Sequence, residues 1–170
     1  MNSLRNGAVV VLVLVAVVLQ VAVLRYVSVD GVVPDLALLL VVAAGFVRGP
    51  HYAATLGFVA GLVLDLAPPA DHVAGRWALA LVVAGYLAGR VRLDARNSVP
   101  AALLAVAGCS FVASSIFALS GVVLGDDGLA AGQMLQVIVI GVVWDVLVAA
   151  VLLPPMTALL RRLRPARVAY

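Results

Sequence analysis

Four charged side chains stand inside or at the ends of long apolar runs. Asp35 and Asp65 lie near the ends of the stretch PDLALLLVVAAGFVRGPHYAATLGFVAGLVLDL, Arg48 lies near its middle, and Asp145 lies in a later run. A carboxylate at the centre of a membrane helix costs roughly 2.5 to 3.5 kcal/mol on insertion scales, so it needs a polar partner inside protein. These residues therefore predict hydrogen bonding within a helical bundle.

The sequence predicts no catalytic, metal or cofactor site. His51 and His72 fall in loops expected on opposite sides of a membrane, and the single cysteine, Cys109, lies within an apolar run. The chain has no Gly-rich phosphate loop and no H-E-x-x-H, G-x-S-x-G or C-x-x-C pattern. We therefore expect a protein that is not an enzyme.

The composition is typical of an integral membrane protein. Hydrophobic residues make up 65% of the chain, charged residues 11%, and the mean hydropathy is +1.21, against roughly 45 to 50% and 25% in soluble domains. The runs predict an all-α protein, residues 1–170 forming one transmembrane domain of six helices in a single bundle. The expected helices are residues 7–24, 35–47, 51–66, 77–89, 100–124 and 134–155.

The second and third expected helices form a hairpin that is too short for lipid alone. At ~1.5 Å per residue neither exceeds ~23 Å, whereas the hydrocarbon core is ~30 Å thick. Pro34 and Asp35 are typical of a helix start, and Arg48 and Gly49 mark the bend. We therefore expect the longer helices to surround this hairpin.

A stripe of small residues runs along the third expected helix. Ala53, Gly57, Gly61 and Asp65 recur every four residues, so they share one face. Such a stripe lets another backbone approach closely, either in ordinary packing or in contact with a partner helix.

Asp145 lies close to the midpoint of the last expected helix. We expect it to point into the bundle, either protonated or hydrogen-bonded to Gln20, Tyr86 or a serine of residues 100–124. Two interpretations stay open: a buried group that sets the bundle shape recognised by a partner, and a single tolerated polar contact.

The arginines predict the orientation. Nine of the eleven fall at the two termini, at Arg48 and in residues 90–96, and only Arg25 and Arg76 fall in the opposite loops. The positive-inside rule therefore places both termini in the cytoplasm. The tail RRLRPAR is expected to contact anionic membrane lipid and not nucleic acid.

Several segments in this order resemble the rod-shape-determining protein MreD family. They are PDLALLL, GFVRGPHYAATLGFVAGLVLDLAPP, GRWALALVVAGYLAGR and a last helix ending PPMTALLRRL, and together they cover most of the chain. Many members are expected to carry a neutral polar residue such as Asn in the last helix, where this chain has Asp145.

The resemblance implies a non-enzymatic subunit of the bacterial cell-elongation machinery in the inner (plasma) membrane, supporting lateral peptidoglycan synthesis. It implies MreC as partner and, more loosely, MreB, a SEDS-type glycosyltransferase and a penicillin-binding transpeptidase. The family is also similar in fold to the substrate-binding subunits of energy-coupling-factor vitamin transporters, which supply the alternative function. A lipid flippase or channel ranks lower, because one buried Asp and scattered serines do not form a polar path.

The first testable prediction concerns topology. With six crossings, cysteines introduced beside Arg5 and Arg164 are expected to react with a membrane-impermeant reagent from the same, cytoplasmic, side. Labelling of the two positions from opposite sides would contradict the six-span count.

Overall fold

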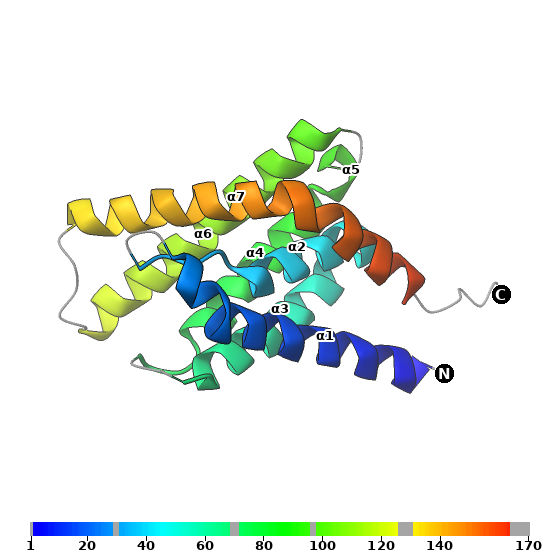
Figure 1. The fold of residues 1–170 in the computed structure, drawn as a ribbon, viewed down its shortest axis with the longest axis horizontal. Coiled ribbons are helices and arrows are strands. Elements are labelled where there is room, and N and C mark those ends of the chain that lie inside the picture. Colours follow the sequence, from blue (N-terminus) through cyan, green and yellow to red (C-terminus); the bar gives the residue numbers. More distant parts are fainter. Residues whose placement is uncertain (1, 29–30, 69–71, 96–97, 126–130, 164–170) are drawn as a thin grey trace.

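The chain folds into helices joined by short connections (Figure 1). The structure is a computed structural model that describes residues 2–28, 31–68, 72–95, 98–125 and 131–163. The prediction of an all-α protein is confirmed for these residues. The α-helices are α1 (Asn2–Ala22), α2 (Leu36–Arg48), α3 (Pro50–Leu66), α4 (Arg76–Arg90), α5 (Arg92–Ala95), α6 (Val99–Leu124) and α7 (Ala131–Arg162), and a 3-10 turn, η1, covers Leu24–Val27.

Two helices are long and apolar enough to cross a membrane by length and composition. Among the described residues these are Val99–Leu124 and Gly132–Arg162, whereas Gly7–Ala22, Leu36–Arg48 and Pro50–Leu66 are shorter apolar helices. The count of six spans and the cytoplasmic termini stay predictions. The first turn of α1 and the last turn of α7 lie at the same end of the bundle (Figure 1).

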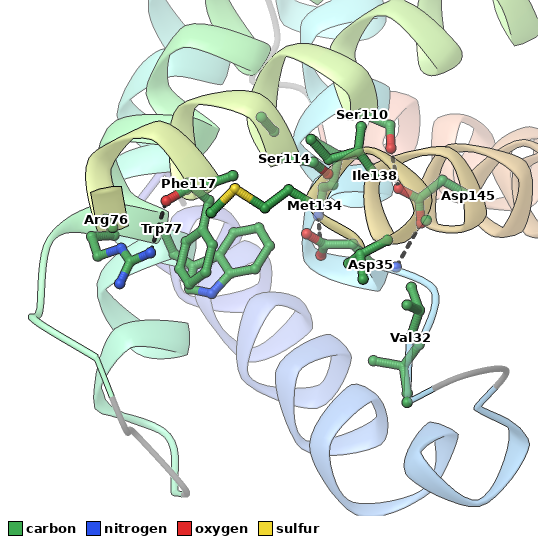
Figure 2. Close-up of a pocket in the computed structure, with 18 of the residues that line it drawn as sticks. Val32, Asp35, Arg76, Trp77, Ser110, Ser114, Phe117, Met134, Ile138 and Asp145 are labelled. Atoms are coloured by element: carbon green, nitrogen blue, oxygen red, sulfur yellow. Dashed lines mark hydrogen bonds between the residues drawn. The ribbon is translucent and has the colours of Figure 1, made fainter. Parts of the chain in front are cut away.

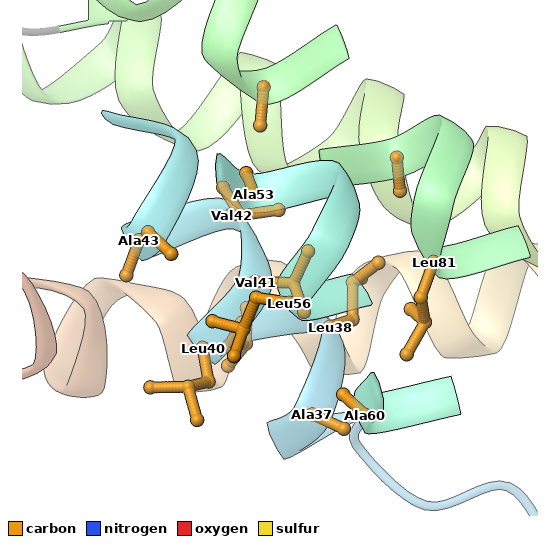
Figure 3. Close-up of a cluster of buried hydrophobic side chains, with 14 of the residues drawn as sticks. Ala37, Leu38, Leu40, Val41, Val42, Ala43, Ala53, Leu56, Ala60 and Leu81 are labelled. Carbon is orange, nitrogen blue, oxygen red and sulfur yellow. The ribbon is translucent and has the colours of Figure 1, made fainter. Parts of the chain in front are cut away.

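Helix α2 forms the centre of the bundle. Every residue from Leu36 to Val47 is buried, and α1, α3, α4, α6 and α7 all pack against it. A helix that is apolar on all sides is stable only where neighbours cover every face. Figure 3 shows the α2 side chains Leu38 and Val41 among Leu56 of α3 and Leu81 of α4. The short second helix is thus enclosed, as its length required.

The ends of α2 and α3 follow from local sequence. Asp35 is extended and its side chain accepts a hydrogen bond from the Leu38 amide, which fixes the start of α2. Gly49 adopts φ 93°, a conformation that favours glycine, and Pro50 opens α3. The bend expected at Arg48 and Gly49 is therefore a turn with almost no connecting loop.

The structure differs from the expected helices mainly at the two ends of the chain. Helix α1 begins at Asn2, ahead of the expected residue 7, and α7 continues through Pro154 and Pro155 to Arg162, past the expected residue 155. A proline inside a helix removes one amide donor but does not require the helix to end when neighbouring turns persist. The expected loop 90–96 contains the short helix α5.

Helices α3 and α4 pack with their backbones in contact. A Cβ added at Gly57 or Gly61 would come within 3.0 Å of backbone atoms of Leu81 or Ala78. On the facing helix, a Cβ at Gly85 or Gly89 would meet backbone atoms of α3 or of the turn before it in the same way. The stripe that begins at Ala53 therefore covers α4 of the same chain and lies inside the bundle.

The close contact yields a stability prediction. Gly57→Leu and Gly61→Leu are expected to lower the free energy of unfolding by several kcal/mol, because backbone atoms cannot move aside as a flexible side chain does. Equilibrium unfolding in detergent micelles measures the effect.

Gly108→Leu is the matched control, since an added Cβ there meets nothing within 4 Å. Wild-type stability of both the Gly57 and the Gly61 variants would show that α3 and α4 do not pack this closely.

Candidate functional site

A network of four polar side chains closes the N-terminus of α2. The Asp35 amide donates to Oδ1 of Asp145 over 2.7 Å, and the Ala37 amide donates to Oε1 of Gln20 over 3.2 Å. The Leu38 amide donates to Oδ1 of Asp35 over 2.8 Å. The hydroxyl of Ser110 donates to Oδ2 of Asp145 over 2.5 Å. These contacts join α1, α2, α6 and α7 at one point.

The network is the solution to a problem that any buried helix start presents. The first amides of a helix have no partner within the helix, and each one left unpaired in an apolar bundle costs about 1 to 3 kcal/mol. Acidic groups also interact favourably with the positive end of the helix dipole. Gln20, Asp35 and Asp145 are 7%, 8% and 3% exposed, so these bonds form away from solvent.

A cavity of about 490 Å³ lies beside this network, between α6 and α7 (Figure 2). Asp35, Asp145 and Ser110 lie at one end of it, and the stacked rings of Trp77 and Phe117, 4.5 Å between centroids, lie at the other. Most of the remaining wall is apolar or small: Val32, Val33, Leu38, Ala113, Ala118, Gly121, Val122, Met134, Val137, Ile138 and Gly141.

Arg76 forms part of the aromatic end of the cavity. It is 7% exposed, donates to the Phe117 carbonyl over 2.8 Å and to the Ser120 hydroxyl over 3.2 Å, and its guanidinium lies 4.2 Å from the Phe117 ring centroid. Arg76 was expected as the last residue of the loop before α4, whereas the structure includes it in the helix. Arg76 is the first residue of α4 and ties that helix to α6.

Asp65 caps a second helix. Its carboxylate accepts from the amides of Gly75 at 2.8 Å, Trp77 at 3.1 Å and Ala78 at 3.1 Å, all at the start of α4. His72 lies 3.7 Å from the same carboxylate. The two aspartates of the central stretch thus hold the starts of two different helices.

The other predicted residues do not line the cavity. Arg48, at the end of α2, donates to the Leu163 carbonyl over 2.6 Å and lies 4.3 Å from the Tyr52 ring centroid. Gly49 forms the turn after it, Ala53, Gly57 and Gly61 pack on α4, and Pro34 precedes the capped start of α2. Tyr86, a suggested partner of Asp145, is exposed, with its hydroxyl 3.4 Å from Arg90 Nη1.

The arrangement offers hydrogen bonding and packing. The described residues contain no group of three or more His, Cys, Asp or Glu side chains able to hold a metal ion. The carboxylates and Arg76 of the cavity wall already bond within the bundle. A molecule in this cavity would therefore interact mainly with apolar side chains and aromatic rings.

Comparison with known proteins gives one match. The family model described as rod shape-determining protein MreD matches residues 2–163. No curated protein and no solved structure matches the chain.

The polar network predicts different results for two substitutions of Asp145. Asp145→Leu leaves the Asp35 amide and the Ser110 hydroxyl without their acceptor, so we expect a loss of roughly 2 kcal/mol or more in the free energy of unfolding. Asp145→Asn keeps an acceptor for the amide, and the Ser110 hydroxyl is able to turn and accept, so we expect a loss below about 1 kcal/mol.

Denaturant titration in micelles measures both variants, with Asp94→Leu as a control at an exposed aspartate of α5. Cell shape should persist in the Asn variant and deteriorate in the Leu variant. A Leu variant as stable and active as wild type would contradict the capping role.

Proposed function

Because the chain belongs to the MreD family of rod-shape-determining proteins, we propose that it is a non-enzymatic membrane subunit of the cell-elongation complex. In this proposal it binds MreC and supports lateral peptidoglycan synthesis. The match over residues 2–163 carries the proposal, since it covers essentially the whole chain. The family is one of structural membrane proteins that determine cell shape.

The internal contacts of the bundle support a scaffold. Asp35, Asp65, Asp145 and Arg76 each bond to backbone or side-chain groups of another part of the same chain. The hydrogen bonds of these four residues fix the positions of the helices. Contacts with other proteins would therefore be made by the outer faces of the bundle. We propose that the protein is a multi-pass inner-membrane protein with cytoplasmic termini, and that MreB, a SEDS-type glycosyltransferase and a penicillin-binding transpeptidase are more distant members of its complex.

The faces of α6 and α7 around the large cavity are the surface that best fits a partner's membrane helix. Ala113, Ala118 and Gly121 give α6 a small-residue wall there, and Gly141 does the same on α7. Small residues allow close helix approach in membranes. In this proposal the MreC helix lies along the opening and inserts side chains into the cavity.

The same cavity favours a second candidate function, binding of a small molecule as in a vitamin-transporter subunit. Trp77, Phe117 and Arg76 are residue types that such a site would use, and 490 Å³ falls within the usual range for ligand pockets. The polar lining groups, however, bond within the bundle. We therefore rank this function second. A rise in melting temperature with a vitamin would favour it.

The proposed contact surface predicts a difference between two neighbouring substitutions. Ala118→Trp fills the opening between α6 and α7 and is expected to reduce copurification of MreC at least fivefold. Leu119→Trp, at an adjacent position that is 64% exposed and does not line the cavity, is expected to leave copurification unchanged. Quantitative immunoblotting after affinity purification measures both.

Equal loss in both variants would place the contact elsewhere on α6. Unchanged MreC recovery in both would contradict a contact at this cavity.

A further inference from the structure

A second cavity lies between the first half of α6 and the second half of α7, the halves that do not line the large cavity. Its volume is about 360 Å³, and it is lined from the start of α6, the second half of α7, the end of α2 and α5. Phe46, Ala102, Leu103 and Leu153 form the apolar part of its wall. Figure 1 shows α6 and α7 diverging toward the end of the bundle where α1 begins and α7 ends.

The mouth of this cavity carries groups that suit an anion. Arg161 lines it, and so does Ser98, the N-cap of α6. The Ser98 oxygen accepts from the Ala101 amide over 3.3 Å, which leaves its hydroxyl hydrogen for donation. The start of a 26-residue helix adds the positive end of its dipole. No acidic side chain of the described residues lines the cavity.

Exposed apolar side chains lie at and beside the cavity. Val99 lines it, and Leu104 and Val151 each follow a lining residue; the three are 71%, 74% and 71% exposed. In two helices that are long and apolar enough to cross a membrane, such faces contact hydrocarbon. A groove that is apolar along its length, open to hydrocarbon and cationic at its end has the chemistry of a phospholipid.

We propose that this cavity is a binding site for an anionic phospholipid. One acyl chain lies between Ala102 and Leu153, and the phosphate lies at the mouth, within reach of Arg161 and the Ser98 hydroxyl. The site is distinct from the large cavity, where the carboxylates and Arg76 bond within the bundle. It does not depend on the proposed binding of MreC.

Charge complementarity decides between a lipid and a partner helix as the occupant. Arg161 is the one charged side chain among the lining residues that the structure describes. A single cation beside a helix start fits one phosphate, whereas an apolar partner helix would gain nothing from that charge. Basic groups near a membrane surface typically add about fivefold each to the binding of anionic lipid.

Native mass spectrometry of the full chain tests the proposal. The protein is purified in a nonionic detergent and titrated with phosphatidylglycerol or with phosphatidylcholine of the same acyl chains. We expect one phosphatidylglycerol to be retained at concentrations at least fivefold lower than phosphatidylcholine. Equal retention of the two lipids would overturn the headgroup assignment and with it the proposal.

Two pairs of variants locate the lipid. Arg161→Gln is expected to weaken phosphatidylglycerol retention about fivefold, whereas Arg162→Gln, the neighbouring arginine outside the lining, is expected to retain it. Ala150→Phe fills the groove and is expected to remove the bound lipid, whereas Val151→Phe, one residue on and facing outward, is expected to keep it.

The site would be overturned if Arg161→Gln retained phosphatidylglycerol as well as Arg162→Gln, or if Ala150→Phe retained it as well as Val151→Phe. Phosphatidylglycerol bound at wild-type affinity by the Ala150 variant would do the same. Melting temperatures without added lipid establish that all four variants are folded.

Discussion

The structure depends on the capped start of α2. A helix that begins in the interior of an apolar bundle presents amides that neither water nor lipid can satisfy. Here Gln20, Asp35 and Asp145 accept those amides, and Ser110 holds Asp145 in place. These acceptors come from α1, α7 and the start of α2 itself. The need to pair the first amides of α2 therefore fixes the positions of these helices relative to one another. Asp65 meets the same requirement for α4, because its carboxylate accepts the amides at the start of that helix.

Much of the fold could be predicted from the lengths of the apolar runs and from the residues that start and end the helices. Helices of residues 35–47 and 51–66 are shorter than the hydrocarbon core, which predicted enclosure of both. The prediction is confirmed for α2, which is buried from Leu36 to Val47, and is wrong for α3, which has an exposed face where Phe58 is 51% exposed. The inward position of Asp145 followed from the cost of exposing it to lipid, and the structure places it there. One of its expected partners, a serine of residues 100–124, is confirmed by the bond to Ser110. Its second partner, the Asp35 amide, was not predicted, because it is 110 residues away and helix packing alone brings the two together. The bonds of Arg76 to Phe117 and Ser120 were not predicted, because these partners are known only once α4 and α6 are placed.

The small-residue stripe shows what a sequence pattern is unable to predict. Spacing alone indicates that Gly57 and Gly61 allow close approach, but it does not distinguish a partner helix from a neighbour in the same chain. The structure gives the neighbour as α4, whose Gly85 and Gly89 complete the contact from the other side. Outside this contact, exposed apolar side chains lie on α1, α6 and α7, among them Val18, Leu104 and Val151. The buried glycines therefore hold α3 against α4 within the bundle, and they are not the small residues of α6 and α7 that the proposed function offers to a partner helix.

The bond between Ser110 and Asp145 joins α6 to α7, and the two cavities lie on either side of it along these helices. When two helices are fixed to each other at one point and pivot there, the spaces between them on both sides widen or narrow together. A change in the crossing angle would therefore reach both ends of the bundle at once. Asp145 therefore serves two purposes, since one oxygen accepts the first amide of the α2 start and the other fixes α6 to α7 between the two cavities.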